Sequence, residues 1–293
     1  PDAVHPPRLR VTSARTPAAG TLITVAPTGA ETEASRAPGL PVTLQSLVET
    51  ARACQAAGAA VIHVHLRDDD GVSTLDVGRL RAAVEALRGS TDLIVQLSTG
   101  GAVTDSEADR LRVLDAEPDS ASLTCGTVNF GDDVFLNRRP FVEELYTRMQ
   151  ERGIAPEFEC FDAGHVTTVS WLLDKHGPPY GGHVHVDLVL GVPGGLPGTA
   201  RALADAVAAL PDGATFSATG VGRAHLTVML AALAHGGNLR VGMEDTLTFA
   251  AGEPVRDNAQ LVARAATLAT LAQRPPLAPA AARELLGLSA RSR

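Results

Sequence analysis

The chain has 293 residues, of which 45% are hydrophobic and only 3% aromatic, and its formal net charge at pH 7 is -8. This length suits one large α/β domain, whereas the low aromatic content and the negative charge argue against nucleic acid or an anionic membrane as the main partner. No apolar run approaches the ~20 residues of a membrane helix. Three widely spaced cysteines without a C-x-x-C motif indicate a reduced, cytoplasmic protein.

Residues 1–20 are rich in Pro, Ala and Arg and lack the apolar stretch of a signal peptide, so we expect a poorly ordered tail there. From residue 21 onward, short β-branched runs alternate with Ala- and Leu-rich helical stretches. The expected strands cover residues 21–28, 60–66, 93–99, 120–126, 156–161, 183–190, 214–220 and 238–243. The expected helices begin near Thr43, Asp76, Asp105, Arg139, Gly164, Thr199, His225 and Asp257.

Capping residues support several of these boundaries. The N-cap residues are Thr43, Asp76, Asp105 and Asp257, and glycines typical of helix C-termini are Gly58, Gly89 and Gly153. Eight successive strand–helix units predict an α/β fold, a (β/α)8 TIM barrel in a single domain spanning residues 21–293. A doubly wound open sheet is the alternative. A last helix within residues 277–288 is expected as a C-terminal extension that packs on a neighbouring subunit.

The second expected strand contains two histidines, His63 and His65, at alternate positions. Alternate residues of a strand point to the same face, so the two imidazoles lie side by side and can serve as ligands of a divalent metal. Two polar residues on a solvated strand face would give the same pattern. A rival pair, His183 and His185 with Asp187, lies at the start of its strand, which is the stabilising end of a barrel, so we place the site at the first pair.

Polar residues recur near the C-terminal ends of other expected strands, where a barrel carries its active site. They are Gln96, Ser98, Ser122, Thr124, Glu157, Glu159, Arg240, Glu244 and Asp245. Because isolated buried charges are costly, this layer indicates a functional cavity. Glu244 is the candidate third metal ligand, four positions after Arg240 on the same face; an ion pair between these two residues is the alternative.

Glycine-rich turns follow three strands, at residues 27–31, 98–101 and 191–198. Such turns let backbone N–H groups approach an anion, although ordinary turn chemistry explains any one of them equally well. The chain has no P-loop, no dinucleotide fingerprint and no G-x-S-x-G motif, which argues against nucleotide hydrolysis, a Rossmann cofactor and serine-type catalysis.

Taken in order, several motifs from about residue 22 to the C-terminus resemble the β-keto acid cleavage enzyme family. The resemblance rests on Thr28-Gly-Ala-Glu31, His63-Val-His65-Leu-Arg67-Asp-Asp-Asp-Gly71, Gln96-Leu-Ser98-Thr-Gly-Gly101, Gly126-Thr-Val-Asn-Phe-Gly-Asp-Asp133, Pro156-Glu-Phe-Glu159, Val189-Leu-Gly-Val-Pro-Gly-Gly195, Arg240-Val-Gly-Met-Glu-Asp245 and Asn258-Ala-Gln-Leu-Val262. So many blocks in one order are far more specific than any single one.

The resemblance implies a zinc-dependent barrel, with another divalent metal as the alternative, that forms a homotetramer. It implies that a β-keto acid and acetyl-CoA are converted to acetoacetate and a new acyl-CoA. The implied metal ligands are His63, His65 and Glu244, and the implied catalytic residues are the base Asp245 with Arg240 and Glu159. The implied substrate-binding residues are Glu31, Ser98, Gly101 and Ser122, with Thr124 in the same pocket.

Three departures from the family pattern concern the pocket rather than the reaction. Thr124 replaces a common Asn, Ala224 stands where some relatives carry Trp, and Cys160 replaces an aliphatic residue. The acidic Glu31 predicts a neutral or cationic keto acid rather than a dicarboxylic one. Arg67, which could pair with Glu31 or with the nearby Asp68, would cancel that preference. Two other functions stay open at this point: a metal-dependent aldolase or hydrolase at the same His-His-Glu centre, and a non-catalytic metal- or metabolite-binding protein.

Overall fold

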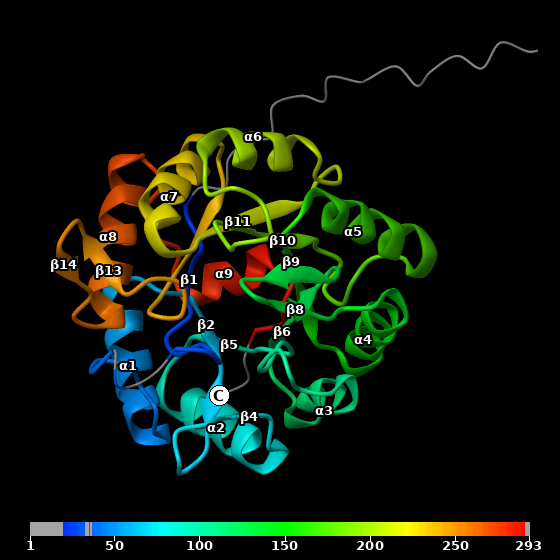
Figure 1. Cartoon of the computed structure of the whole chain (residues 1–293), viewed down its shortest axis with the longest axis horizontal. Coiled ribbons are helices and arrows are strands. Elements are labelled where there is room, and N and C mark those ends of the chain that lie inside the picture. Colours follow the sequence, from blue (N-terminus) through cyan, green and yellow to red (C-terminus); the bar gives the residue numbers. More distant parts are fainter. Residues whose placement is uncertain (1–19, 33–34, 36, 291–293) are drawn as a thin grey trace, which may run out of the picture.

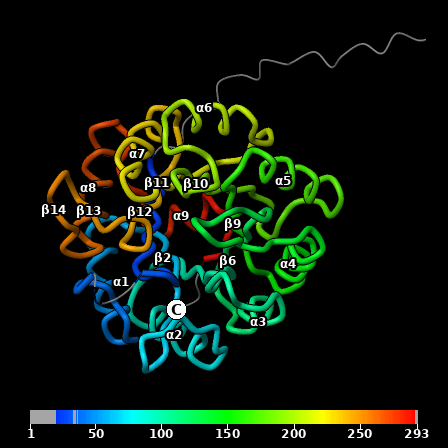
Figure 2. Tube along the Cα trace, viewed as in Figure 1, coloured from blue at the N-terminus to red at the C-terminus, as the bar shows by residue number. Residues whose placement is uncertain are grey.

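The computed structural model describes residues 20–32, 35 and 37–290. Eight parallel strands close into a barrel in the order β1-β12-β11-β10-β9-β6-β5-β2, with helices arranged around it (Figures 1 and 2). The strands are β1 (Ile23–Val25), β2 (Val61–Val64), β5 (Ile94–Leu97), β6 (Ser120–Thr124), β9 (Ala155–Cys160), β10 (His185–Leu190), β11 (Thr215–Gly220) and β12 (Asn238–Val241). The predicted (β/α)8 TIM barrel is thus confirmed; the expected tail lies, apart from Gly20, outside the described residues.

The helices that surround the barrel follow the predicted order. They are α1 (Leu44–Ala57), α2 (Val77–Ser90), α3 (Glu107–Arg112) with the 3₁₀ turn η2 (Val113–Ala116), α4 (Arg139–Arg152), α5 (Ala163–His176), α6 (Ala200–Ala208), the turn η3 (Gly222–Ala224) with α7 (His225–Ala234), and α8 (Asn258–Leu271). Caps at Thr43, Asp76 and Asp257 are confirmed, and Gly58 and Gly153 end their helices in the left-handed conformation.

Two predicted caps are wrong. Ser106, not Asp105, caps α3, because the Asp105 carboxylate instead accepts a hydrogen bond from the backbone N–H of Ala102 (2.7 Å) in the preceding turn. Gly89 lies inside α2, and Thr91 follows as the C-cap with an extended backbone.

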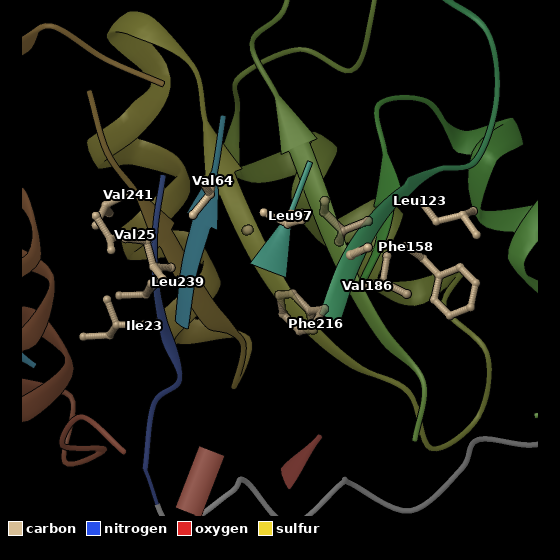
Figure 3. Close-up of a cluster of buried hydrophobic side chains, with 14 of the residues drawn as sticks. Ile23, Val25, Val64, Leu97, Leu123, Phe158, Val186, Phe216, Leu239 and Val241 are labelled. Atoms are coloured by element: carbon tan, nitrogen blue, oxygen red, sulfur yellow. The ribbon is translucent and has the colours of Figure 1, made fainter. Parts of the chain in front are cut away.

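The main hydrophobic core lies between the strands and the helices rather than inside the barrel. Alternate strand side chains, among them those labelled in Figure 3, join helix residues such as Leu47 and Leu80 in one buried cluster. The intervening positions face the barrel interior and are largely polar, as with Thr24, Gln96 and Ser217. The stability of the fold therefore comes mostly from the outer shell, which leaves the interior available for chemistry.

The last helix, α9 (Pro279–Leu285), closes the N-terminal end of its own barrel and lies at the centre of the ring in Figure 1. Ala282 and Leu288 share a buried cluster with Leu22, Val61 and Ile94 from the strands. The expected last helix is confirmed, and its contact with a neighbouring subunit stays a prediction.

Three short hairpins extend the C-terminal ends of the barrel strands. They are β3 (Leu66–Arg67) with β4 (Ser73–Thr74), β7 (Val128–Phe130) with β8 (Asp133–Phe135), and β13 (Thr248–Ala250) with β14 (Glu253–Pro254). In the described part of the chain, none of the helices combines the length and apolar character that crossing a bilayer requires.

Candidate metal centre and active-site pocket

Three potential metal ligands converge at the C-terminal end of the barrel. His63 lies on β2, and His65 follows the end of that strand. Their Nε2 atoms lie 3.9 and 3.7 Å from Oε1 of Glu244, which comes from the chain after β12. Within the described ranges, His63, His65 and Glu244 are the one group of three or more His, Cys, Asp or Glu residues whose ligand atoms approach closely enough to share an ion. The structure thus brings together the three ligands predicted from the sequence.

Gln96 on β5 fixes the orientation of the His63 ring. Its Oε1 lies 2.6 Å from Nδ1 of His63, so the neutral imidazole carries its proton on Nδ1 and directs the lone pair of Nε2 toward Glu244. The Gln96 amide is held in turn by Glu157 on β9, whose Oε2 accepts a hydrogen bond from Nε2 at 2.8 Å. The sequence predicted Gln96 on the polar face of its strand. It did not predict the pairing with His63, which depends on the register of β5 against β2.

A tight turn after β12 brings Glu244 and the next residue, Asp245, into the same pocket. On a continuing strand the two side chains would point to opposite faces. Instead β12 ends at Val241, and the backbone N–H of Asp245 bonds to the carbonyl of Gly242 at 3.1 Å. A Cβ on Gly242 would lie 1.8 Å from the carbonyl oxygen of Ala26, so only glycine lets the turn press against β1. The expectation that Glu244 lies on the strand itself is corrected: the turn, not strand spacing, brings it back to Arg240.

Arg240 on β12 is the electrostatic centre of the pocket. Its guanidinium donates to Oε1 of Glu159 at 3.1 Å, to Glu244, and to both carboxylate oxygens of Asp245 at 3.2 and 3.3 Å. Asp187 lies 3.9 Å away. One buried cation thus holds several carboxylates. The ion pair considered as an alternative role for Glu244 is present, and Glu244 also lies within reach of the two candidate histidine ligands.

The protonation states suit a metal centre with an adjacent base. Burial lowers the pKa of His63 to about 3, which keeps its imidazole neutral and able to coordinate. Burial opposes ionisation of Glu244, but Arg240, His65 and His63 together outweigh it and lower the pKa to about 2. Burial raises the pKa of Asp245 to about 7, in spite of Arg240. Of these two adjacent carboxylates, Glu244 is therefore anionic and suited to bind a metal, whereas Asp245 exchanges its proton near neutral pH.

The arrangement fits a divalent cation. Two neutral imidazole nitrogens and one carboxylate are the donor set that zinc and similar ions take when one position stays open for a substrate. The second oxygen of Glu244, Oε2, is buried without a hydrogen-bond partner among the described residues, as expected of an atom left for an ion.

The other predicted substrate-binding residues fall into two groups. Ser98, Gly101 and Glu31 line a cavity of about 210 Å³ together with the metal ligands, Arg240, Asp245 and Glu159. Ser122 and Thr124 do not line the cavity. Ser122 is fully buried, and Thr124 donates to Oε2 of Glu159 at 2.9 Å. Both therefore support the lining residues from behind.

Arg67 does not form a salt bridge with Glu31 in the described structure. Its Nη2 donates to the backbone carbonyls of Gly29 and Thr32 at 3.0 and 2.6 Å, which pins the loop after β1. Glu31 itself is exposed at the rim of the cavity.

A set of apolar residues, here called the apolar wall, completes the lining of the cavity, and the sequence did not reveal it. Its residues come from four separate parts of the chain: Phe130 and Phe135 of the β7–β8 hairpin, Phe161 after β9, Val189 on β10 with Val192 after it, and Val221 after β11. These positions are far apart in the sequence and meet only once the barrel has closed.

His183 and His185 lie away from this site, at the opposite end of the barrel. His183 Nε2 and His185 Nδ1 share the Thr215 hydroxyl, each at 2.7 Å, and His185 Nε2 lies 3.0 Å from Ser217 Oγ. Their hydrogen bonds fit the structural role predicted for them.

Comparisons with known proteins agree with this geometry. A family model described as beta-keto acid cleavage enzyme matches residues 21–288. A relative from Acetoanaerobium sticklandii, 3-keto-5-aminohexanoate cleavage enzyme, is 36% identical over 274 residues, which cover 92% of this chain and 98% of that protein. A relative from Cupriavidus necator, 3-oxoadipate:acetyl-CoA acetyltransferase, is 33% identical over 272 residues, covering 91% and 94%. The solved complex of ObcA with oxaloacetate has a TM-score of 0.70 at 21% identity, over 86% of this chain and 68% of that one, and supports the fold.

Proposed function

Because the chain belongs to the beta-keto acid cleavage enzyme family, we propose that it converts a β-keto acid and acetyl-CoA to acetoacetate and a new acyl-CoA. The observation that supports this reaction is the position of Asp245. It lies in one cavity with the His63, His65 and Glu244 group and accepts hydrogen bonds from Arg240. A protein that only bound a metal or a metabolite would need no proton acceptor beside it.

We propose that His63, His65 and Glu244 hold zinc, with another divalent metal as the alternative. When bound, such an ion supplies Lewis-acid polarisation of the ketone oxygen. Ser98 is well placed to receive the keto acid's carboxylate, because its Oγ accepts from the N–H of Gly100 at 3.1 Å and, among the described residues, its hydroxyl donates to no other group. The neighbouring glycine turn provides backbone close to the same position.

Asp245 takes a proton from the carbon between the two carbonyl groups, and Arg240 holds its carboxylate in place. That carbon then bonds to the acetyl carbonyl of acetyl-CoA and the thiolate leaves. The thiolate adds to the original ketone carbon, the old carbon–carbon bond breaks, and Asp245 returns the proton to the departing acetoacetate. Atoms balance: the acetyl group moves onto the keto acid's two-carbon unit, and the remaining acyl group moves onto CoA.

The test uses metal-loaded protein, a series of β-keto acids and acetyl-CoA with heavy carbon in its acetyl group. We expect acetoacetate labelled in its methyl and keto carbons and an unlabelled new acyl-CoA, both detected by mass spectrometry. Omitting acetyl-CoA is the control. Keto acid consumption that does not depend on acetyl-CoA would instead support the aldolase or hydrolase function.

The homotetramer also enters as a proposal. Leu226 and Leu230 on α7 and Leu271 on α8 are exposed apolar side chains that an interface could cover. Light scattering on the purified protein tests it, and a monomeric mass would contradict it.

A further inference from the structure

The active-site cavity is lined by two chemically different sets of residues. One comprises the metal ligands, Arg240 and Asp245, and the other is the apolar wall formed by Phe130, Phe135, Phe161, Val189, Val192 and Val221. Phe135, Phe161, Val189 and Val192 are at most 8% exposed and form a buried cluster of their own with Val128. A continuous apolar surface in the same cavity as the charged groups Arg240, Asp245 and Glu244 indicates a ligand with one charged end and one apolar end.

The apolar wall is built to keep its shape. The Phe130 ring meets Phe135 and Phe161 edge to face, with centroids 6.3 and 6.2 Å apart. The hairpin is tied to the loop after β10 by a hydrogen bond from Gly131 N–H to the Pro193 carbonyl at 3.1 Å. Gly194 permits this contact, since a Cβ there would lie 2.4 Å from the Asn129 carbonyl oxygen.

Within the described ranges, each cation near this wall already has partners. Arg110 lies 4.7 Å from the centroid of the Phe135 ring but donates to Thr99, Leu136 and Asn137. Of the described residues that line the cavity, Arg240 is the one with a guanidinium or ammonium group, and carboxylates already occupy it. Arg67 is committed to backbone carbonyls of the β1 loop. A second carboxylate on the substrate would thus lose its hydration without gaining a partner. Glu31 lies exposed at the rim, where solvent weakens its attraction for a cationic group.

We propose that the apolar wall receives the acyl substituent of the keto acid, so that the substrate class is β-keto acids with an uncharged, apolar substituent. This rests on the proposed function and sharpens it. The names of the two relatives indicate substrates with an amino group on C5 and with a second carboxylate, respectively, both beyond the ketone as counted from the first carboxylate. The apolar wall predicts a different preference for this chain.

The first experiment measures kcat/KM for straight-chain β-keto acids of increasing length, a dicarboxylic one and an amino-substituted one, all at saturating acetyl-CoA. We expect kcat/KM to rise about fourfold per added methylene until the wall is covered. The charged substrates should fall at least tenfold below a neutral one of equal length. A dicarboxylic or amino-substituted substrate that exceeds the neutral one would overturn the proposal.

The second experiment changes the wall. Phe130→Arg should lower kcat/KM for the apolar keto acid and raise it for the dicarboxylic one, with KM for acetyl-CoA unchanged. Val134→Arg is the matched control, because Val134 lies on the same hairpin but is 48% exposed and outside the cavity. Should Phe130→Arg fail to fold, Val192→Thr supplies a milder change of the same wall and should reduce the preference for the apolar substrate.

Two outcomes separate the possible failures. If Phe130→Arg raises KM for acetyl-CoA and leaves the order of keto acids intact, the wall receives the CoA arm and the proposal is wrong. If wild-type protein releases acetoacetate from none of the keto acids, the proposed function itself fails. In that case calorimetric binding of the same keto acids to metal-loaded protein still tests the apolar preference, and equal affinity for charged and apolar acids would refute it.

Discussion

Gln96→Leu is the sharpest test of how the chain prepares its metal centre. The substitution nearly preserves size but removes the oxygen that lies 2.6 Å from His63 Nδ1, at a position only 3% exposed. A buried N–H without an acceptor costs about 1–3 kcal/mol. The change also removes the hydrogen bond to Glu157 Oε2, and the other oxygen of that carboxylate already has no partner among the described residues.

We expect metal affinity to fall about 10–100-fold, the range measured when such a supporting partner of a histidine ligand is lost. The assay is competition with a chromogenic chelator, accompanied by denaturant unfolding to confirm that the variant is folded. Gln55→Leu is the control, because Gln55 makes its hydrogen bond to the N–H of Asp92 away from the cavity. Affinity within threefold of the wild type in a folded Gln96→Leu variant would refute the argument.

Three further predictions concern single residues. His63→Ala should lose both bound metal and turnover while His183→Ala keeps them, as measured by elemental analysis; the reverse result would move the centre to the other end of the barrel. Asp245→Asn should retain metal but lower kcat by about 10²–10⁴-fold, and near-normal kcat in steady-state assays would contradict its role as the base. Burial raises the pKa of Glu157 from 4.5 to about 7, so its contribution to stability is complete below pH 4.5 and is lost as the pH rises through 7. The unfolding free energy of the Glu157→Gln variant should therefore fall less steeply between pH 5 and 8 than that of the wild type. An equally steep fall in the variant would be evidence against this.

The fold could be predicted because its signals are local. Alternating apolar runs, N-caps such as Thr43 and Asp257, and the count of eight units all survive in the structure. The pair His63 and His65 was recognisable for the same reason, since strand alternation alone places both on one face.

The parts that the sequence did not reveal depend on contacts between distant segments. The pairing of Gln96 with His63 needs the register of β5 against β2, and the approach of Glu244 needs the turn that Gly242 permits. Asp105 was misassigned as a cap because its competing partner, the N–H of Ala102, belongs to a turn whose shape is not visible in the pattern. The apolar wall is assembled from a hairpin, one strand and three connections that are far apart in the sequence, so no single pattern predicts that they meet.

The closure of the ring has a consequence for how the protein is made. The first strand pairs with the last, Ile23 beside Leu239, and the Thr21 hydroxyl donates to the Arg274 carbonyl across 253 positions of sequence. During translation β1 therefore leaves the ribosome long before its second neighbour exists, with one edge unpaired and open to wrong association. Such distant pairing slows folding. A nascent chain that ends before β12 lacks Arg240, Glu244 and Asp245 as well as the closing strand, so the active site and the closed barrel are completed in the same late step.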